Sequence, residues 1–303
     1  MKTTGASQRF VLLGHPVGHS LSPVIHQAAY RALGLTHRYE LVDCADEGAV
    51  QGAFEALRRG EIAGANVTTP WKRLALSLAD LVAPSAQRVG VANVLARSAE
   101  GAIVAHNTDV PALAEEFQRL ADRVRRVLVL GNGGAAPAVV AAAQDAGADR
   151  IAISARRFSA SVSEGDWPHA AAFSAQGATL LAWPEGDPRA ASRLREVAQR
   201  IDLLVNCTSA GMHGADDGQT LAAVVPWEHI PQRALAYDLI YNPAVTPFLT
   251  RARACGLQAE NGLGMLVAQA ALAIELWLSV TPPRAPLLAA AEAELQARRL
   301  SKP

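Results

Sequence analysis

A glycine-rich turn between an apolar strand and an alanine-rich helix constrains the fold of this chain most strongly. Val127–Leu130 is a continuous apolar run, and the turn Gly131-Asn132-Gly133-Gly134-Ala135-Ala136 leads from it into a helical segment that extends to Ala146. A second apolar strand, Ile151–Ser154, follows. Such a unit is typical of a parallel sheet that binds a dinucleotide, because the glycines let backbone N–H groups approach a pyrophosphate at the helix N-terminus. We therefore expect an α/β fold.

The residues after the second strand indicate which dinucleotide binds. An Asp or Glu at this place would accept a hydrogen bond from the 2′-hydroxyl of NAD, whereas this chain has Ala155-Arg156-Arg157. Guanidinium groups bind a 2′-phosphate through charge-assisted hydrogen bonds. The pattern favours NADP(H) over NAD(H), and the alternative interpretation is a pair of exposed surface arginines.

Composition narrows the class of protein. The chain has 303 residues, of which 50% are hydrophobic and 18% charged, so we expect about two domains with sizeable cores. A formal net charge of zero gives no indication of nucleic acid or of an acidic membrane surface as a partner. The apolar run Gly262–Val280 contains Gln269 and Glu275, which predicts a buried helix and no membrane span.

Cysteine and histidine spacing bears on the compartment and on metal binding. Cys44, Cys207 and Cys255 lie far apart and match no disulfide or metal pattern. His15 and His19 are four residues apart, but an intervening Pro and Gly break any helix between them, so we expect no metal site. The N-terminus lacks a signal-peptide pattern. We therefore expect a reduced, cytoplasmic compartment.

A second polar turn lies at Gly64–Lys72. Ile62–Val67 is a predicted strand and Trp71–Ala79 a predicted helix, which places Thr68 and Lys72 at a strand-to-helix turn. Only three of the 28 basic residues are lysines, and Lys72 is the one that is not at a chain end. Lysine can give up its proton in a protein whereas arginine does not, so Lys72 is a candidate proton donor. A solvated lysine at a helix start is the alternative.

Two hydroxyls precede a predicted helix near the N-terminus. The strand Phe10–Leu13 leads into a loop, and Ser22 with Pro23 starts the helix. Capping is therefore the alternative role for Ser22. Ser20 has no such structural role, so it is the better candidate for a ligand contact.

Three further polar residues stand out by their position. Asn93 falls in a predicted strand, where Asn is disfavoured, so we expect it to have a specific partner. Asp109 precedes a helix that starts at Pro111, and both capping and catalysis are open for it. Gln269 lies amid apolar residues, and a buried amide needs hydrogen bonds from another side chain or from a polar ligand.

Taken together, these motifs resemble the shikimate dehydrogenase family. The matching segments occur in family order between residues 10 and 270: His15–Pro23, Gly64–Lys72, Gly90–Leu95, Asn107–Asp109, Gly131–Ala136, Asn206–Met212, Asp238–Leu249 and Asn261–Ala270. The resemblance implies an α/β fold of two domains, a substrate domain built from both chain ends and an inserted Rossmann-like NADP-binding domain with a parallel sheet. We place the substrate domain at residues 1–110, the NADP-binding domain at 111–245 and the returning C-terminal helices at 246–303.

The resemblance also implies an activity and a set of roles. The expected reaction is the reversible reduction of 3-dehydroshikimate to shikimate by NADPH in aromatic amino acid biosynthesis, with Lys72 and Asp109 as the catalytic pair. The implied substrate contacts are Ser20 and Ser22 for the carboxylate, Thr68, Asn93, Asp109 and Gln269 for the ring hydroxyls, and Tyr241 to close the site. The implied cofactor contacts are Gly131, Asn132, Gly133, Gly134, Ala135 and Ala136 in the phosphate loop, Arg156 at the 2′-phosphate with Arg157 beside it, and Thr208 and Gly262.

The chain departs from the family pattern in one region. The family's Asn-Arg-Thr is Ala155-Arg156-Arg157 here, and Ala160 replaces a second arginine, so the strictness of NADP over NAD stays open. Residues 158–200 have no functional account. The nearest rival function is that of a quinate or quinate/shikimate dehydrogenase, and a rival of another class is a non-catalytic sensor of a shikimate-like ligand. The sequence does not fix the oligomeric state, and a homodimer is one option.

Overall fold

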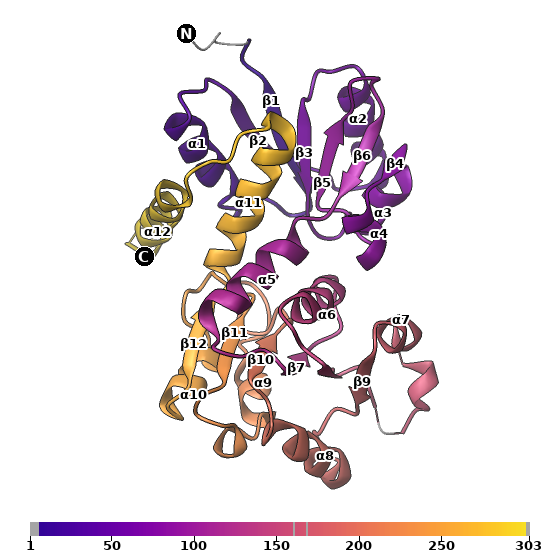
Figure 1. The fold of residues 1–303 in the computed structure, drawn as a ribbon, viewed down its shortest axis with the longest axis vertical. Helices are drawn as coiled ribbons and strands as arrows, with labels where there is room; N and C mark the ends of the chain where they lie inside the picture. The colour runs from indigo at the N-terminus through magenta and orange to yellow at the C-terminus, as the bar shows by residue number, and fades with distance from the viewer. Residues whose placement is uncertain (1–5, 160, 168, 301–303) are drawn as a thin grey trace. The chain divides into compact units, whose positions relative to one another are not determined.

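The chain folds into two compact units, and Figure 1 colours them by position along the sequence. The computed structural model describes residues 6–159, 161–167 and 169–300. The first unit combines residues 1–112 with 266–303, and the second unit comprises residues 113–265. Segments from both chain ends thus share one unit, as the resemblance implied.

A mixed six-stranded sheet forms the centre of the first unit. The strand order is β2-β1-β3-β5-β6-β4. Strand β1 runs parallel to β2 and β3, whereas β5 is antiparallel to β3 and β6. The strands are β1 (Arg9–Gly14), β2 (Arg38–Asp43), β3 (Gly64–Val67), β4 (Leu81–Val82), β5 (Val94–Arg97) and β6 (Ile103–His106).

The helices of the first unit bury apolar stripes next to this sheet. They are α1 (Ser22–Ala32), α2 (Glu47–Arg58), α3 (Lys72–Leu78), α4 (Pro84–Val89) and α12 (Arg284–Leu300). Helix α2 illustrates the pattern, because Asp46 caps its first turn and its buried Val50, Phe54 and Leu57 share a core cluster with Leu13 of β1. At the other end of the chain, α12 packs against α1.

The sheet of the second unit is parallel throughout. Its strand order is β12-β11-β10-β7-β8-β9. The strands are β7 (Arg126–Leu130), β8 (Arg150–Ser154), β9 (Ala178–Leu181), β10 (Leu203–Asn206), β11 (Leu235–Asp238) and β12 (Gln258–Asn261). This is the order of a doubly wound dinucleotide fold, in which ligands bind beyond the carboxyl ends of the first and fourth strands, here β7 and β10. The predicted Rossmann-like sheet is confirmed.

Residues 158–200 supply one edge of this sheet. They contain α7 (Ala170–Ala175), β9 and α8 (Pro188–Ala198). Phe158 and Trp167 are buried and stack with ring centroids 4.9 Å apart. The segment that had no functional account therefore has a structural one, because it provides the third strand of the doubly wound order and covers it with apolar side chains.

The expected domain boundary at residue 245 differs from the structure. Helix α10 (Pro247–Ala254) and strand β12 belong to the second unit, because β12 pairs with β11 and extends the parallel sheet. The boundaries between the units fall within α5 (Asp109–Leu120) and α11 (Leu263–Leu278). The remaining helices of the second unit are α6 (Ala136–Asp145) and α9 (Gln219–Val224).

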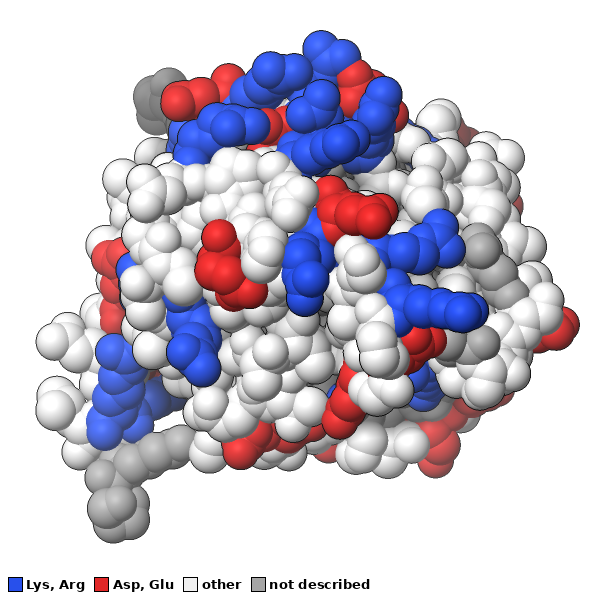
Figure 2. Space-filling model, turned by 90° about the horizontal axis from the view of Figure 1, so that it is seen from below, with Lys and Arg blue, Asp and Glu red and all other residues white. Residues whose placement is uncertain are grey.

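Charge and hydropathy follow the composition. On the face drawn in Figure 2, basic side chains gather along the upper edge with a few acidic ones among them, and charges of both signs are scattered among uncharged residues below. Helix α11 covers most of the apolar run that raised the membrane question. Within the described residues, the chain forms no helix with the length and hydropathy needed to span a bilayer.

Candidate active site

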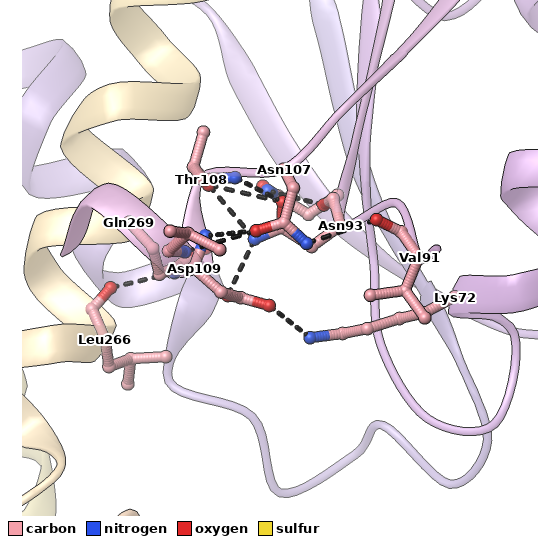
Figure 3. A network of polar contacts seen from close by, with 10 residues as sticks. Lys72, Val91, Asn93, Asn107, Thr108, Asp109, Leu266 and Gln269 are labelled. Atoms are coloured by element: carbon pink, nitrogen blue, oxygen red, sulfur yellow. Dashed lines mark hydrogen bonds and ion pairs between the residues drawn. The ribbon is translucent and has the colours of Figure 1, made fainter. Parts of the chain in front are cut away.

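A lysine and an aspartate meet in the first unit, as Figure 3 shows. Lys72 is the first residue of α3, directly after the turn that follows β3, and Asp109 is the first residue of α5. The Nζ atom of Lys72 donates to Oδ2 of Asp109 at 2.6 Å. The Lys72 side chain is 22% exposed and that of Asp109 8%, so the lysine is the more accessible partner of the pair. A charge-assisted hydrogen bond at this degree of burial fixes the amine in one place.

Asn93 holds the carboxylate from its other side (Figure 3). Its Nδ2 donates to Oδ1 of Asp109 at 2.7 Å and to Oγ1 of Thr108 at 3.0 Å, while its Oδ1 accepts from the backbone N–H of Thr108 at 2.7 Å. Asn93 is buried and directly precedes β5, so it lies just outside the strand in which the sequence placed it. The expected specific partners are therefore Thr108 and Asp109.

Asn107, to which the sequence motifs assigned no role of its own, caps the helix that begins at Asp109. Its Oδ1 accepts from the backbone N–H groups of Asp109 at 3.0 Å and of Val110 at 3.2 Å, and its Nδ2 donates to the carbonyl of Val91 at 3.2 Å. The capping alternative for Asp109 is consequently wrong. Both carboxylate oxygens of Asp109 are instead engaged by Lys72 and Asn93.

A buried polar chain lies beneath this network. Asn66 of β3 donates through Nδ2 to the backbone carbonyl of Asn93 at 3.2 Å and accepts from the hydroxyl of Tyr39 at 2.7 Å. The ring of His26 stacks on Tyr39 with centroids 3.8 Å apart, and within the described part of the chain neither ring nitrogen of His26 has a hydrogen-bond partner. Full burial lowers the pKa of His26 to about 3, so the ring is neutral in the folded chain. These residues support the strand end from which Asn93 projects.

The local hydrogen bond at the start of α1 comes from Ser20 and not from Ser22. Helix α1 begins at Ser22, and no side chain caps it, so capping is not the role of Ser22. Ser20 takes the local structural role, because its Oγ accepts from the backbone N–H of Ser22 at 3.1 Å and lies 3.1 Å from Oγ of Ser22. The pair places two hydroxyls at the N-terminus of α1, where the helix dipole favours an anion.

Arg298 fastens the same loop from the far end of the chain. Its Nη1 donates to the carbonyl of His19 at 2.6 Å, and its Nη2 lies 3.4 Å from the carbonyl of Ser20. Glu294, one turn earlier on α12, accepts from Nε at 2.7 Å. No motif in the sequence singles out Arg298, because no local pattern connects residues that are 279 positions apart.

Thr68 and Gln269 complete the predicted substrate residues of the first unit. Thr68 follows β3 and is half-buried, and its methyl group fills the space that a Cβ on Gly14 would occupy. Gln269 is 8% exposed and donates through Nε2 to the carbonyl of Leu266 at 2.8 Å. The buried amide of Gln269 thus has one hydrogen-bond partner in its own helix.

In the second unit, the glycine-rich loop joins β7 to α6 as predicted. Gly131 has φ +106°, and a Cβ there would lie 2.7 Å from Cγ2 of Thr208. A Cβ on Gly134 would meet no atom of the described chain within 4 Å. No side chain caps α6, which starts at Ala136. The loop therefore leaves open space and an uncapped helix N-terminus, which fits a pyrophosphate.

Polar residues at the ends of β10 and β11 stabilise the loop that carries Thr208. Oγ1 of Thr208 donates to Oδ1 of Asn206 at 2.8 Å, and Nδ2 of Asn206 donates to Oδ1 of Asp238 at 3.0 Å. Asp238 also accepts from the hydroxyl of Thr246 at 2.6 Å. Desolvation raises the pKa of Asp238 to about 6 in spite of these hydrogen bonds. Thr208 is thereby held beside Gly131.

The remaining cofactor and closing candidates also lie in the second unit. Arg156 and Arg157 follow β8 and are exposed, and Nη1 of Arg156 donates to Oδ2 of Asp216 at 3.1 Å. Ala160 lies outside the described residues. Tyr241 follows β11 and is half-buried. A Cβ on Gly262 would collide with the backbone of Leu239, so close packing alone already requires glycine there.

The structure therefore groups the candidates by unit. Lys72, Asp109, Asn93, Thr68, Ser20, Ser22 and Gln269 belong to the first unit, and the loop residues, Arg156, Arg157, Thr208, Tyr241 and Gly262 belong to the second. Across the described residues, no three His, Cys, Asp or Glu side chains are arranged to hold a metal ion. What the first unit offers is an amine, a carboxylate and hydroxyls, and what the second offers is backbone and guanidinium groups.

Sequence and structure comparisons agree on one family. Residues 12–95 match the family described as "Shikimate dehydrogenase substrate binding domain", and residues 262–292 match "Shikimate 5'-dehydrogenase C-terminal domain". A shikimate dehydrogenase (NADP(+)) of Geobacter sulfurreducens is 38% identical over 93% of this chain and 95% of its own length.

Solved structures show the same fold. Shikimate 5-dehydrogenase from Thermus thermophilus, in complex with NADP(H) and shikimate, has a TM-score of 0.79 and 35% identity, and the match covers 94% of this chain and 99% of that one. The 5-ketofructose reductase of Gluconobacter sp. strain CHM43 has a TM-score of 0.78 and 27% identity, with 95% of this chain and 99% of that one covered. The chain belongs to the shikimate dehydrogenase family.

Proposed function

We propose that this protein is an NADP-dependent shikimate dehydrogenase, which reversibly reduces 3-dehydroshikimate to shikimate in aromatic amino acid biosynthesis. The curated relatives carry this name at 33–38% identity. The observation that carries the proposal is the hydrogen bond of 2.6 Å between the only internal lysine and Asp109. A sensor that merely binds a ligand needs no proton donor, so this pair speaks for an enzyme.

The pair supplies the proton that ketone reduction requires. NADPH, when bound, supplies the hydride, and the carbonyl oxygen of the substrate then develops negative charge. Lys72 donates the proton to that oxygen in reduction and takes it back in the reverse direction, as a positioned general acid and base. Asp109 orients the amine and, with its second oxygen held by Asn93, keeps a fixed direction itself.

The hydroxyl-rich part of the first unit binds the substrate. Ser20 and Ser22 receive the carboxylate, since two hydroxyls at the N-terminus of α1 offer donors in the field of the helix dipole. Thr68, Asn93, Asp109 and Gln269 bind the ring hydroxyls, with Tyr241 closing the site. The hydroxyl of Thr68 has no hydrogen-bond partner within the described chain, which leaves it available for a ring hydroxyl.

The loop of the second unit binds the cofactor. Gly131, Asn132, Gly133, Gly134, Ala135 and Ala136 surround the pyrophosphate with backbone N–H groups, and Thr208 and Gly262 lie near the cofactor. Arg156 binds the 2′-phosphate with Arg157 beside it. Support comes from the uncapped start of α6 and from the absence of a carboxylate in the sequence Ala155-Arg156-Arg157.

A steady-state assay tests the function directly. Shikimate and quinate are each offered with NADP+ and, in parallel, with NAD+, and 5-ketofructose is offered with NADPH and, in parallel, with NADH. Shikimate with NADP+ is expected to give the highest kcat/KM. Quinate at equal efficiency would favour a quinate/shikimate dehydrogenase instead, and turnover with 5-ketofructose alone would remove the shikimate assignment.

Compartment and assembly complete the proposal. The three cysteines are free, which fits the reducing cytoplasm. The edge strand β4 exposes Leu81 (54%) and Val82 (41%), an apolar edge that a second copy of the chain would cover in a homodimer. Light scattering after size-exclusion chromatography tests the homodimer, since a particle of one chain mass, 31.8 kDa, would exclude it.

A further inference from the structure

We propose that Asp216 weakens the discrimination between NADP and NAD by neutralising Arg156, the residue assigned to the 2′-phosphate. The inference rests on the proposed function, because it concerns the cofactor site of that enzyme. It starts from one contact in the second unit, in which Nη1 of Arg156 lies 3.1 Å from Oδ2 of Asp216. The guanidinium of Arg156 is thus already paired with the carboxylate of Asp216.

The loop fixes the Asp216 carboxylate beside Arg156. Oδ1 of Asp216 accepts from the backbone N–H of Gly218 at 2.9 Å, and the Asp216 carbonyl accepts from Gly211 N–H at 2.7 Å. Gly218 has φ +80°, and a Cβ there would lie 2.9 Å from the backbone of Gly211, so the turn is closed tightly on itself. Asp216 is therefore a positioned charge and is less free to move than a carboxylate on an open loop.

Arg156 and Arg157 differ in their partners. The Arg156 side chain is 59% exposed and that of Asp216 35%, so the ion pair is accessible to solvent and to a ligand phosphate. Arg157 is exposed and makes no hydrogen bond or ion pair with the described part of the chain. The guanidinium of Arg156 is thus paired with a carboxylate, whereas that of Arg157 has no such partner in the described part of the chain.

The charges predict a graded preference for NADP. A 2′-phosphate must compete with the carboxylate of Asp216 for the guanidinium of Arg156. The 2′-hydroxyl of NAD does not compete with Asp216, because a hydroxyl can donate a hydrogen bond to a carboxylate. Exposed ion pairs of this kind change an equilibrium constant by a factor of roughly one and a half to five. Asp216 is accordingly expected to lower the affinity for the 2′-phosphate by a few-fold and to leave NAD usable.

Binding of two nucleotide fragments measures this effect without any turnover. Isothermal titration calorimetry compares adenosine 2′,5′-bisphosphate with adenosine 5′-monophosphate on the full chain, in wild type and in Asp216→Asn. Asparagine keeps an amide oxygen for the Gly218 N–H but removes the charge. The affinity for the bisphosphate should rise about threefold while that for the monophosphate changes by less than about one and a half fold.

The neighbouring residue provides a matched control. Asp217→Asn removes the same charge from the same loop, and Oδ1 of Asp217 accepts from the backbone N–H of Gln219 at 2.9 Å instead of from an arginine. It should leave the ratio of the two affinities unchanged. A threefold rise in both variants, an unchanged ratio in Asp216→Asn or a fall of that ratio would each overturn the proposal.

A double variant tests whether Asp216 acts through Arg156. In an Arg156→Ala background, Asp216→Asn should raise the affinity for the bisphosphate by less than about one and a half fold. A full threefold rise there would overturn the route through Arg156. Because the fragments bind without substrate, a chain that discriminates them as expected but does not oxidise shikimate would contradict the proposed function while leaving this inference standing.

Discussion

The candidate site of the first unit consists of side chains, whereas that of the second unit consists mainly of backbone. In the first unit, side chains of Lys72, Asp109 and Asn93 are joined by hydrogen bonds of 2.6–2.7 Å, so the identity of each residue matters. In the second unit, the loop after β7 depends on residues without side chains, because a Cβ on Gly131 would lie 2.7 Å from Cγ2 of Thr208 whereas Gly134 borders open space. In the proposed roles, proton transfer thus depends on a fixed network of side chains, whereas phosphate binding depends on exposed backbone N–H groups.

Removal of the amine is the strongest test of the first half of this comparison. Lys72→Ala should lower kcat at least about a hundredfold, the usual scale for the loss of a general acid, and leave NADPH affinity nearly intact. Lys72→Arg is the control that retains the charge but gives up no proton, and it should be almost as inactive. Turnover near the wild-type rate in either variant would remove Lys72 from proton transfer.

An added methyl group tests the second half. Gly131→Ala should lower the free energy of unfolding by roughly 2 kcal/mol or more, because φ is +106° and a Cβ would lie 2.7 Å from Thr208. Thermal unfolding measures this change. Gly134→Ala should unfold at the wild-type temperature but bind NADP+ more weakly, since its Cβ meets no atom of the described chain within 4 Å and would occupy space for the pyrophosphate. Unaltered NADP+ binding in Gly134→Ala would argue against a phosphate loop.

The buried ring of His26 in the first unit makes the stability of the protein depend on pH. Burial lowers the pKa of His26 to about 3, below 6.5 in the unfolded chain, so the unfolded chain takes up a proton first and stability falls as pH drops below 6.5. Between pH 7.5 and 5.5 this linkage amounts to about 1.4 kcal/mol. His26→Phe should remove that part of the decline in urea unfolding, whereas replacement of the exposed His19 by Asn should retain it. An identical decline in His26→Phe would show that His26 is not the titrating group.

The smallest expected effect concerns the loop of the two serines. Arg298→Ala should raise the KM for shikimate about threefold with kcat nearly unchanged, because the lost hydrogen bonds to His19 and Ser20 position the loop and touch no reacting atom. Arg299→Ala, the exposed neighbour on α12, is the control and should leave KM unchanged. A drop in kcat alone would place Arg298 in another role.

Local patterns in the sequence predicted much of the second unit and less of the first. The glycine turn, the strands beside it and Arg156 follow one another along the chain, so a short window of sequence contains the whole signal. The first unit depends on partners far apart, such as Asn66 beneath Asn93 and Arg298 on His19, and no periodicity reports such contacts. Local sequence context also gave one wrong prediction. Ser22 precedes a proline and was a candidate helix cap, but the backbone N–H of Ser22 donates to Oγ of Ser20.

The amine of Lys72 also allows the candidate site to be followed by chemical modification. Because every other basic side chain away from the chain ends is an arginine, a reagent that acylates amines has one internal target, and mass spectrometry reads its modification at a single peptide. Partial exposure of 22% leaves that amine reachable, while the bond to Asp109 restrains it. With substrate bound at Lys72 as proposed, the rate of acylation is expected to fall, so that it would report ligand occupancy without any engineered label.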